Sequence, residues 1–347
     1  MILQPFFLRM FGNPITRQIK STATVGTTTS VTFEVTATKI WIQRIYNGVS
    51  IVTAYEDLVD TAITLDIDAD TSLGIFGSIE KLIAELNSLE SIDLTKLTSL
   101  VYLKIGENNL GVINVSSNIN LEYLDCNSTS ITALELSTNT ALTILECGFN
   151  QLTALDLSTN TALTSLDCGF NQLTALDLST NTALTSLNVQ SNQLTALDLS
   201  TNTALDQLYI SSNQLTALDL STNTALDQLN ISSNQLTALD LSTNTALTIL
   251  ECGFNQLTAL DLSTNTALTI LNVQSNQLTA LDLSTNTALT VVYVRGNPFM
   301  SDGTEATNFV TNLPTVTSGN LYLSTEDSEA ATVQPLAEAK GWIVTIS

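Results

Sequence analysis

The chain has 347 residues, of which 44% are hydrophobic, so it is long enough and apolar enough to bury a sizeable core. Its 33 acidic and 10 basic residues give a formal net charge of -23, which repels nucleic-acid phosphates and anionic membrane surfaces. It contains no histidine, the commonest general base and zinc ligand. These totals exclude nucleic acid as an expected partner and most familiar catalytic arrangements.

The first part of the chain, residues 1–76, reads as a small β-rich domain. The stretch SVTFEVTATKIWIQRIYNG alternates as a strand does, and Asn47-Gly48 is a typical hairpin turn before SIVTAY. The opening letters MILQPFFLRMFGN have no basic residue before Arg9 and no clear small-residue cleavage site, so a standard signal peptide is not expected. No apolar run approaches the roughly 18 to 20 residues of a membrane span, so membrane insertion is not expected either.

A repeat of 21 residues takes over from Ile79, and residues 77–299 are assigned to about eleven coils. The segment NQLTALDLSTNTAL occurs in seven identical copies, the first starting at Asn150. An asparagine occupies one slot throughout, at 87, 108, 150, 171, 192, 213, 234, 255, 276 and 297, with Thr129 as the substitute. The first coil, SIEKLIAELN, also fits an amphipathic helix, so it is either a strand-bearing coil or a helical cap.

The letters LTSLDCGFNQL match the leucine-rich-repeat pattern L-x-x-L-x-L-x-x-N-x-L. The second half of each coil, LTALDLSTN, repeats the pattern, so periods of 10 and 11 are nested inside 21. The sequence therefore resembles the nested leucine-rich repeats of bacterial surface proteins and bacteriophage structural proteins. The resemblance implies a leucine-rich-repeat solenoid. Because both halves of the coil look strand-like, we expect a two-sheet, mostly β, nearly straight rod.

Two further features concern the ends and the core. Residues 300–347 leave the repeat and read as helix, strand, helix and strand, an α/β cap for the open end, with Pro335 inside the second helix. The cysteines share one slot of the repeat, where other copies carry valine or isoleucine. They are expected to be free, buried thiols rather than disulfides, because parallel side chains in one column do not face each other. They are Cys126, Cys147, Cys168 and Cys252.

Variation between copies is confined to one half of the coil. ALDLSTNTAL is fixed in the core copies, whereas the other strand reads ECGF, DCGF, NVQS, YISS, NISS or YVRG. A surface that keeps its frame and varies its outward residues is typical of recognition, and drift between recently duplicated copies is the alternative. The candidate binding residues are Tyr102, Lys104, Tyr123, Asp125, Glu146, Asp167, Asn188, Gln207, Tyr209, Gln228, Asn230, Glu251, Asn272, Tyr293 and Arg295.

The fixed half carries a column of carboxylates that begins at Glu135 and continues with one aspartate per coil from Asp156 to Asp282. Neighbours about 5 Å apart repel by roughly 0.8 kcal/mol in water, so they must face solvent. Between Lys104 and Arg295 there is no lysine or arginine. Calcium needs about six to eight oxygen ligands, which a flat row does not supply. We therefore expect no cofactor, and interpret the column as solvated charge that keeps identical repeats from aggregating.

The sequence has no phosphate-cradling glycine loop and no carboxylate pair that stands apart from a repeat column, so an enzyme is not expected. With the resemblance, this favours a non-enzymatic bacteriophage virion protein, a fibre or decoration on the virion surface. Its amino-terminal domain would contact other virion proteins, and its repeats a host-surface protein or glycan. The alternatives are an internalin-like bacterial surface adhesin and a cytoplasmic protein-protein scaffold. Homo-oligomerisation is left open, because no heptad segment indicates it.

Overall fold

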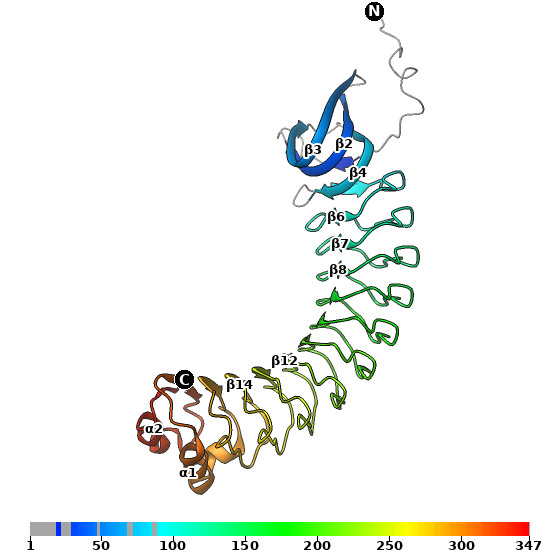
Figure 1. Ribbon diagram of the computed structural model, residues 1–347. Coiled ribbons are helices and arrows are strands. Elements are labelled where there is room, and N and C mark those ends of the chain that lie inside the picture. Colours follow the sequence, from blue (N-terminus) through cyan, green and yellow to red (C-terminus); the bar gives the residue numbers. More distant parts are fainter. Residues whose placement is uncertain (1–18, 22–28, 47–48, 68–71, 85–88, 347) are drawn as a thin grey trace, which may run out of the picture. The chain divides into compact units, whose positions relative to one another are not determined.

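The computed structural model describes residues 19–21, 29–46, 49–67, 72–84 and 89–346, with side chains described in 79–84 and 92–346. The chain divides into two compact units, Met1–Leu163 and Thr164–Ser347. Figure 1 shows the elements of each unit in chain order. Both units contain coils of the same 21-residue design.

The first unit begins with long antiparallel strands. β2 and β3 form the predicted hairpin, with Tyr46 opposite Val49, while its turn, Asn47-Gly48, and the stretch 1–18 lie outside the described residues. β4 pairs with the other edge of β2. The strands are β1 (Ile19–Ser21), β2 (Thr29–Tyr46), β3 (Val49–Ile67), β4 (Ser72–Ile83) and β5 (Leu89–Ile92).

Strand β4 connects this sheet to the repeats. Its last residues, 81–83, pair in parallel with the first strand of the next coil, 102–104. SIEKLI, the end of β4, is therefore strand and not helix. As a strand it pairs with β2 on one side and with residues 102–104 on the other, whereas a helix would leave backbone groups of both neighbours without partners. Ile79, Leu82 and Ala84 are fully buried, as the repeat register predicts. The boundary proposed after residue 76 falls inside β4, and the division into three domains stays a prediction.

Each coil contributes one strand of three residues, paired in parallel and in register with its neighbours inside the unit. The middle residue points into the core and the flanking two point outward. The first unit has β6 (Tyr102–Lys104), β7 (Tyr123–Asp125) and β8 (Ile144–Glu146). The second has β9 (Ser165–Asp167), β10 (Ser186–Asn188), β11 (Gln207–Tyr209), β12 (Gln228–Asn230), β13 (Ile249–Glu251), β14 (Ile270–Asn272) and β15 (Val291–Tyr293).

The expected second sheet is not formed: in the coils that the structure describes, the fixed half consists of turns. The backbone N–H of Asn244 donates to Leu241 O at 3.0 Å, and that of Leu247 donates to Asn244 O at 3.2 Å. These bonds within one coil use N–H groups that a ladder between coils would need. The prediction of a leucine-rich-repeat solenoid is confirmed, whereas its two-sheet form is wrong.

Turns also change the shape of the second unit. Its short strands lie on the inner side of a curved stack and its turns on the outer side (Figure 1). Strands joined by a ladder are held about 4.8 Å apart, but turns without a ladder are free to spread. Within this unit, the expectation of a nearly straight rod is therefore wrong.

Two asparagines per coil hold the turns in place. Asn244, fully buried, donates from Nδ2 to Leu220 O at 3.1 Å and to Asn223 O at 2.9 Å, both in the preceding coil. Asn234 donates to the carbonyl of Ile210, and its Oδ1 accepts from the N–H of Leu215 at 3.0 Å. Side-chain amides at both positions thus replace part of the missing ladder.

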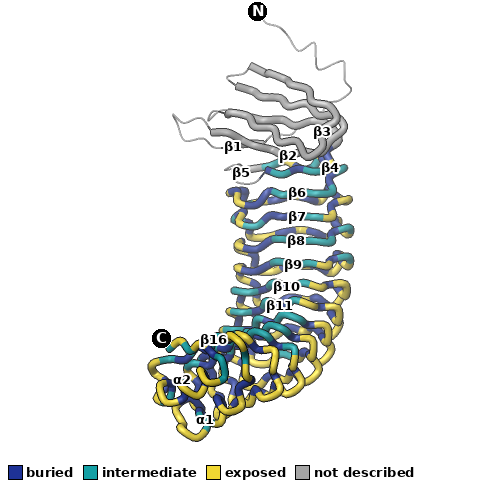
Figure 2. The backbone as a smooth tube through the Cα atoms, turned by 60° about the vertical axis from the view of Figure 1, so that its left-hand side comes forward, coloured by how far each residue is buried: buried dark blue, intermediate teal, exposed yellow. Residues whose placement is uncertain are grey.

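The core of each coil is a set of buried apolar side chains. Figure 2 shows how buried, intermediate and exposed residues follow one another along the backbone of the coils. None of the six in the coil around Asn234 exposes more than 8% of its surface. They are Leu226, Leu229, Ile231, Leu236, Leu239 and Leu241. One coil cannot bury such a set alone, so the stack depends on its neighbours and its ends.

The carboxyl-terminal end continues the sheet with the predicted helix, strand, helix and strand. β16 pairs in parallel with β15, and β17 with β16. Trp342 is buried, and its indole N–H donates to Pro314 O at 2.9 Å. None of the helices described is long and apolar enough to cross a membrane. The elements are a 3-10 helix (Pro298–Ser301), α1 (Gly303–Asn312), β16 (Gly319–Leu323), α2 (Ala330–Glu338, which contains Pro335) and β17 (Trp342–Ile346).

We predict that Asn244→Leu lowers the free energy of unfolding by roughly 2–4 kcal/mol, because two buried carbonyls lose their donor. Thr243→Ala, at the exposed neighbouring position, is the control and should change it by less than about 0.5 kcal/mol. Urea unfolding of the full chain measures both. Equal effects of the two changes would contradict the structural role of the amide.

The cysteines are free and fully buried, as predicted. Burial raises the pKa of the Cys252 thiol to about 12, so the reactive thiolate is scarce near neutral pH. We predict that a thiol-specific reagent at pH 8 labels none of the four until the chain is unfolded. Rapid labelling of the folded protein would show that the coils open.

Candidate functional site

The outward residues of the short strands form a surface that we call the strand face. Their side chains are half-buried, because neighbours from adjacent coils lie against one another. The candidate residues lie on it as predicted by alternation, except that Arg295 follows β15 and Asp125 is buried, with 3% exposed. Asp125 Oδ1 accepts from the N–H of Asn127 at 3.0 Å, which draws the carboxylate into the surface.

In the first unit, the strand face carries stacked aromatic rings beside an ion pair. Tyr102 and Tyr123 stack with centroids 4.2 Å apart, and Lys81 Nζ lies 5.5 Å from the ring centroid of Tyr102. Lys104 pairs with Asp125 at 3.6 Å. Burial, and next the charge of Glu146, raise the pKa of Tyr123, so its hydroxyl stays protonated. This part of the face is preordered by its own contacts.

In the second unit, a polar cluster surrounds Tyr209. Its hydroxyl donates to Gln228 Oε1 at 2.7 Å, and Asn230 Nδ2 donates to Glu251 Oε2 at 2.8 Å. Burial raises the pKa of Tyr209, and the charges of Glu251, Asp227 and then Asp206 raise it further. The hydroxyl therefore lies close to negative charge. A partner that brings hydrogen-bond donors would suit this region.

The last coils of the second unit combine aromatic and basic groups. Tyr293 stacks on Tyr322 of β16 with centroids 4.2 Å apart, and Arg295 Nε donates to Gln274 Oε1 at 2.6 Å. Tyr322 belongs to the strand face but was not predicted. It lies after the repeat ends, so no column pointed to it, although GNLYLST was read as a strand.

Sequence reasoning also missed the most exposed aromatic side chains. Phe149, Phe170 and Phe254 follow a glycine in the CGF copies and are 58%, 39% and 50% exposed. Their φ angles are 53°, 54° and 55°, in the left-handed region that bulky side chains rarely adopt. Most other copies have serine in this slot, and Gly296 fills it in the last. A strained, exposed aromatic suits a function better than it suits packing.

In two of these copies, at Gly169 and Gly253, the next coil leaves little space for a side chain before the phenylalanine. A Cβ on Gly253 would lie 3.0 Å from Gln274 Cγ and 3.0 Å from Asn272 Oδ1. Gly169 stands in the same relation to Gln190, with 3.2 Å to its Cγ. In the second unit, CGF copies are thus followed by copies whose glutamine occupies the space. Part of the variation is coordinated between neighbours, which independent drift does not explain.

The opposite side of each coil presents exposed residues of the fixed half, which we call the turn face. The carboxylates are exposed, as predicted, and each aspartate of the column accepts the N–H of the serine two residues on. The distance is 2.9 Å from Asp240 Oδ1 to Ser242 N. These bonds lower the pKa of Asp240, against the charges of Asp219 and Asp261. Among the described residues, no group of three or more His, Cys, Asp or Glu is placed to hold a metal ion.

No family model matches the chain, and no curated protein matches it. Solved structures do. The functional domain of InlJ from Listeria monocytogenes, which includes a cysteine ladder, is 39% identical, with a TM-score of 0.62 over 63% of this chain and 49% of that one. This chain thus spans about half of the InlJ structure that it matches.

Two further structures agree. YopM, a leucine-rich effector protein from Yersinia pestis, is 25% identical, with a TM-score of 0.53 over 63% of this chain and 61% of that one. A leucine-rich-repeat protein of Leptospira interrogans, 22% identical, has a TM-score of 0.59 over 73% and 62% and shows the fold alone. Together with the 21-residue coils, these likenesses show that the chain is a leucine-rich-repeat protein.

Proposed function

We propose that the chain is a non-enzymatic recognition protein that binds a protein partner through the strand face. The observation that carries this proposal is the exposed Phe254, which follows Glu251 closely in the chain, together with the polar cluster that contains Glu251, Asn230 and Tyr209. An aromatic anchor next to hydrogen-bonding groups already fixed in place is the usual composition of a protein-binding hot spot. The fixed contacts reduce the entropy lost when a partner binds.

We further propose that this binding takes place at a bacterial surface or among secreted proteins. The likenesses to InlJ and to a leucine-rich effector support such a role. A bacteriophage virion protein anchored by residues 1–76 is the finer alternative. The mosaic copies favour it, since exchange of coils alters the strand face without changing the ends. Binding of labelled full-length protein to virions or to bacterial cells separates the two.

We predict that Phe254→Ser weakens binding to the recognised cells or virions about tenfold, because the anchor is lost. Stability should change by less than about 0.5 kcal/mol, since serine occupies this slot as Ser233 and Ser275. Flow cytometry with labelled full-length protein measures binding on cells, and co-sedimentation measures it on virions.

The matched control is Thr258→Ser, an exposed change on the turn face of the same coil. Binding should also disappear after protease treatment of the target surface, because the proposed partner is a protein. Unchanged binding by Phe254→Ser, or binding that survives the protease, would contradict the proposal.

A further inference from the structure

The turn face is identical in seven copies although it is exposed. In NQLTALDLSTNTAL, the leucines and the second asparagine are buried, so packing explains them. The exposed side chains need another reason. In the coil around Asn234 they are Gln235, Thr237, Ala238, Asp240, Ser242, Thr243, Thr245 and Ala246.

The fold does not require these residues. The coil that starts at Asn108 has Val112, Asn114 and Ile119 where the seven copies have alanine, aspartate and threonine. It still forms the same turn: Asn114 Oδ1 accepts from the N–H of Ser116 at 3.1 Å, and Asn118 Nδ2 donates to two carbonyls of the preceding coil. The identity of the other copies is therefore not a folding constraint.

Recent duplication does not explain the identity either. Within the same coils, the strand half has diverged to ECGF, DCGF, NVQS, YISS, NISS and YVRG. Copies of one age would be expected to change at exposed positions on both sides. The turn face has kept its exposed residues while the half-buried strand face has changed, so the turn face has a role that depends on equality between coils.

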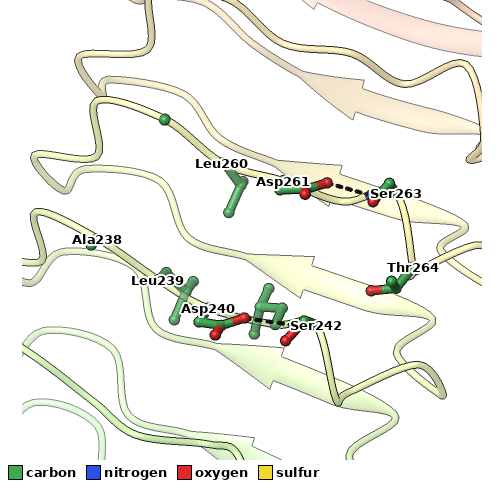
Figure 3. Close-up of a pocket in the computed structure, with 10 residues that line it drawn as sticks. Ala238, Leu239, Asp240, Ser242, Leu260, Asp261, Ser263 and Thr264 are labelled. Atoms are coloured by element: carbon green, nitrogen blue, oxygen red, sulfur yellow. Dashed lines mark hydrogen bonds between the residues drawn. The ribbon is translucent and has the colours of Figure 1, made fainter.

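A groove lies between the turns of two consecutive coils. The structure gives one of about 310 Å³ between the coils that start at Asn234 and Asn255. Figure 3 shows Asp240 and Asp261 in equivalent places on the two coils, each bonded to the serine two residues on. Leu239, Leu260 and the alanines before them supply apolar lining. Each carboxylate is held as an acceptor, and hydroxyls lie beside it.

We propose that the turn face binds a linear neutral polysaccharide, one or more sugar units per groove. Sugars present many hydroxyl donors to fixed carboxylate and hydroxyl acceptors, and C–H surfaces to alanine and leucine. A homopolymer repeats the same chemistry along its length, which is what an array of equal sites matches. Linked weak sites then add up to useful affinity. A basic protein would be attracted by the aspartate carboxylates, but its binding would not require the same serine, threonine and alanine residues in every coil.

The test uses the full-length protein in affinity electrophoresis with soluble β-glucan, mannan and dextran, and in depletion by insoluble cellulose and chitin. Poly-L-lysine is the cationic probe. We expect at least one neutral polysaccharide to bind, with an affinity for its oligosaccharides that rises with their length. Absence of binding to the whole panel, or binding of poly-L-lysine alone, overturns the proposal.

Two sets of variants locate the site. The set D219N/D240N/D261N removes acceptor charge but keeps the turn, as Asn114 does. The set A217V/A238V/A259V adds bulk at the alanines, two of which line the groove described above, and the chain already has valine in this slot at Val112. Each should weaken polysaccharide binding about tenfold or more. The alanine set decides the matter if the aspartate set fails to fold.

The matched control, D206N/D227N/E251Q, removes the same charge beside or on the strand face and should change polysaccharide binding less than about twofold. Equal loss in the control would show a general charge effect and overturn the proposal. Phe254→Ser should leave polysaccharide binding intact. The Phe254→Ser variant therefore tests protein recognition, and the turn-face variants test polysaccharide binding, so that each proposal can fail without the other.

Discussion

The structure depends on side-chain amides that bond to the preceding coil. Turns cannot form a ladder as strands do, and buried carbonyls without donors are costly. The asparagine in each STNT segment, such as Asn244, supplies the donor, and the asparagine after each strand, such as Asn234, both donates and accepts. The three-residue strands and the residues that flank them also stack through backbone hydrogen bonds between coils, such as that from Gln235 N to Leu215 O. Because the amides hold consecutive turns together, the second half of each coil need not form a strand, and its exposed surface differs from that of the strand half.

Much of this was readable from the sequence. The 21-residue register predicted which residues are buried, from Ile79 and Leu82 onward, and the separate pattern of residues 300–347 predicted the order of helices and strands there. What pattern reading could not settle was backbone conformation in LTALDLSTN, where apolar alternation suits a strand and a series of turns equally. The choice was decided by hydrogen bonds inside the coil, such as Asp240 with Ser242, which residue type alone does not reveal.

The candidate site was predictable in part for a similar reason. Alternation located the strand face, since direction along a strand follows from period two. It gave no sign that Phe254 stands outside the alternation, because the left-handed φ at that slot turns the side chain away from the strand pattern. Nor did it show that Asp125 is drawn inward by a backbone N–H. Local geometry, rather than composition, determines which side chains a partner can reach.

The amide contacts also bear on how the length of the array can change. The asparagine bonds between the described coils span 19 to 24 residues, so a coil is bonded in this way only to its immediate neighbour. Insertion or loss of a whole coil inside the run of identical copies leaves every remaining junction chemically the same. Recombination between copies can therefore change the number of coils without changing any contact between them. β4 and the terminal α/β segment would still cover the two ends of the array.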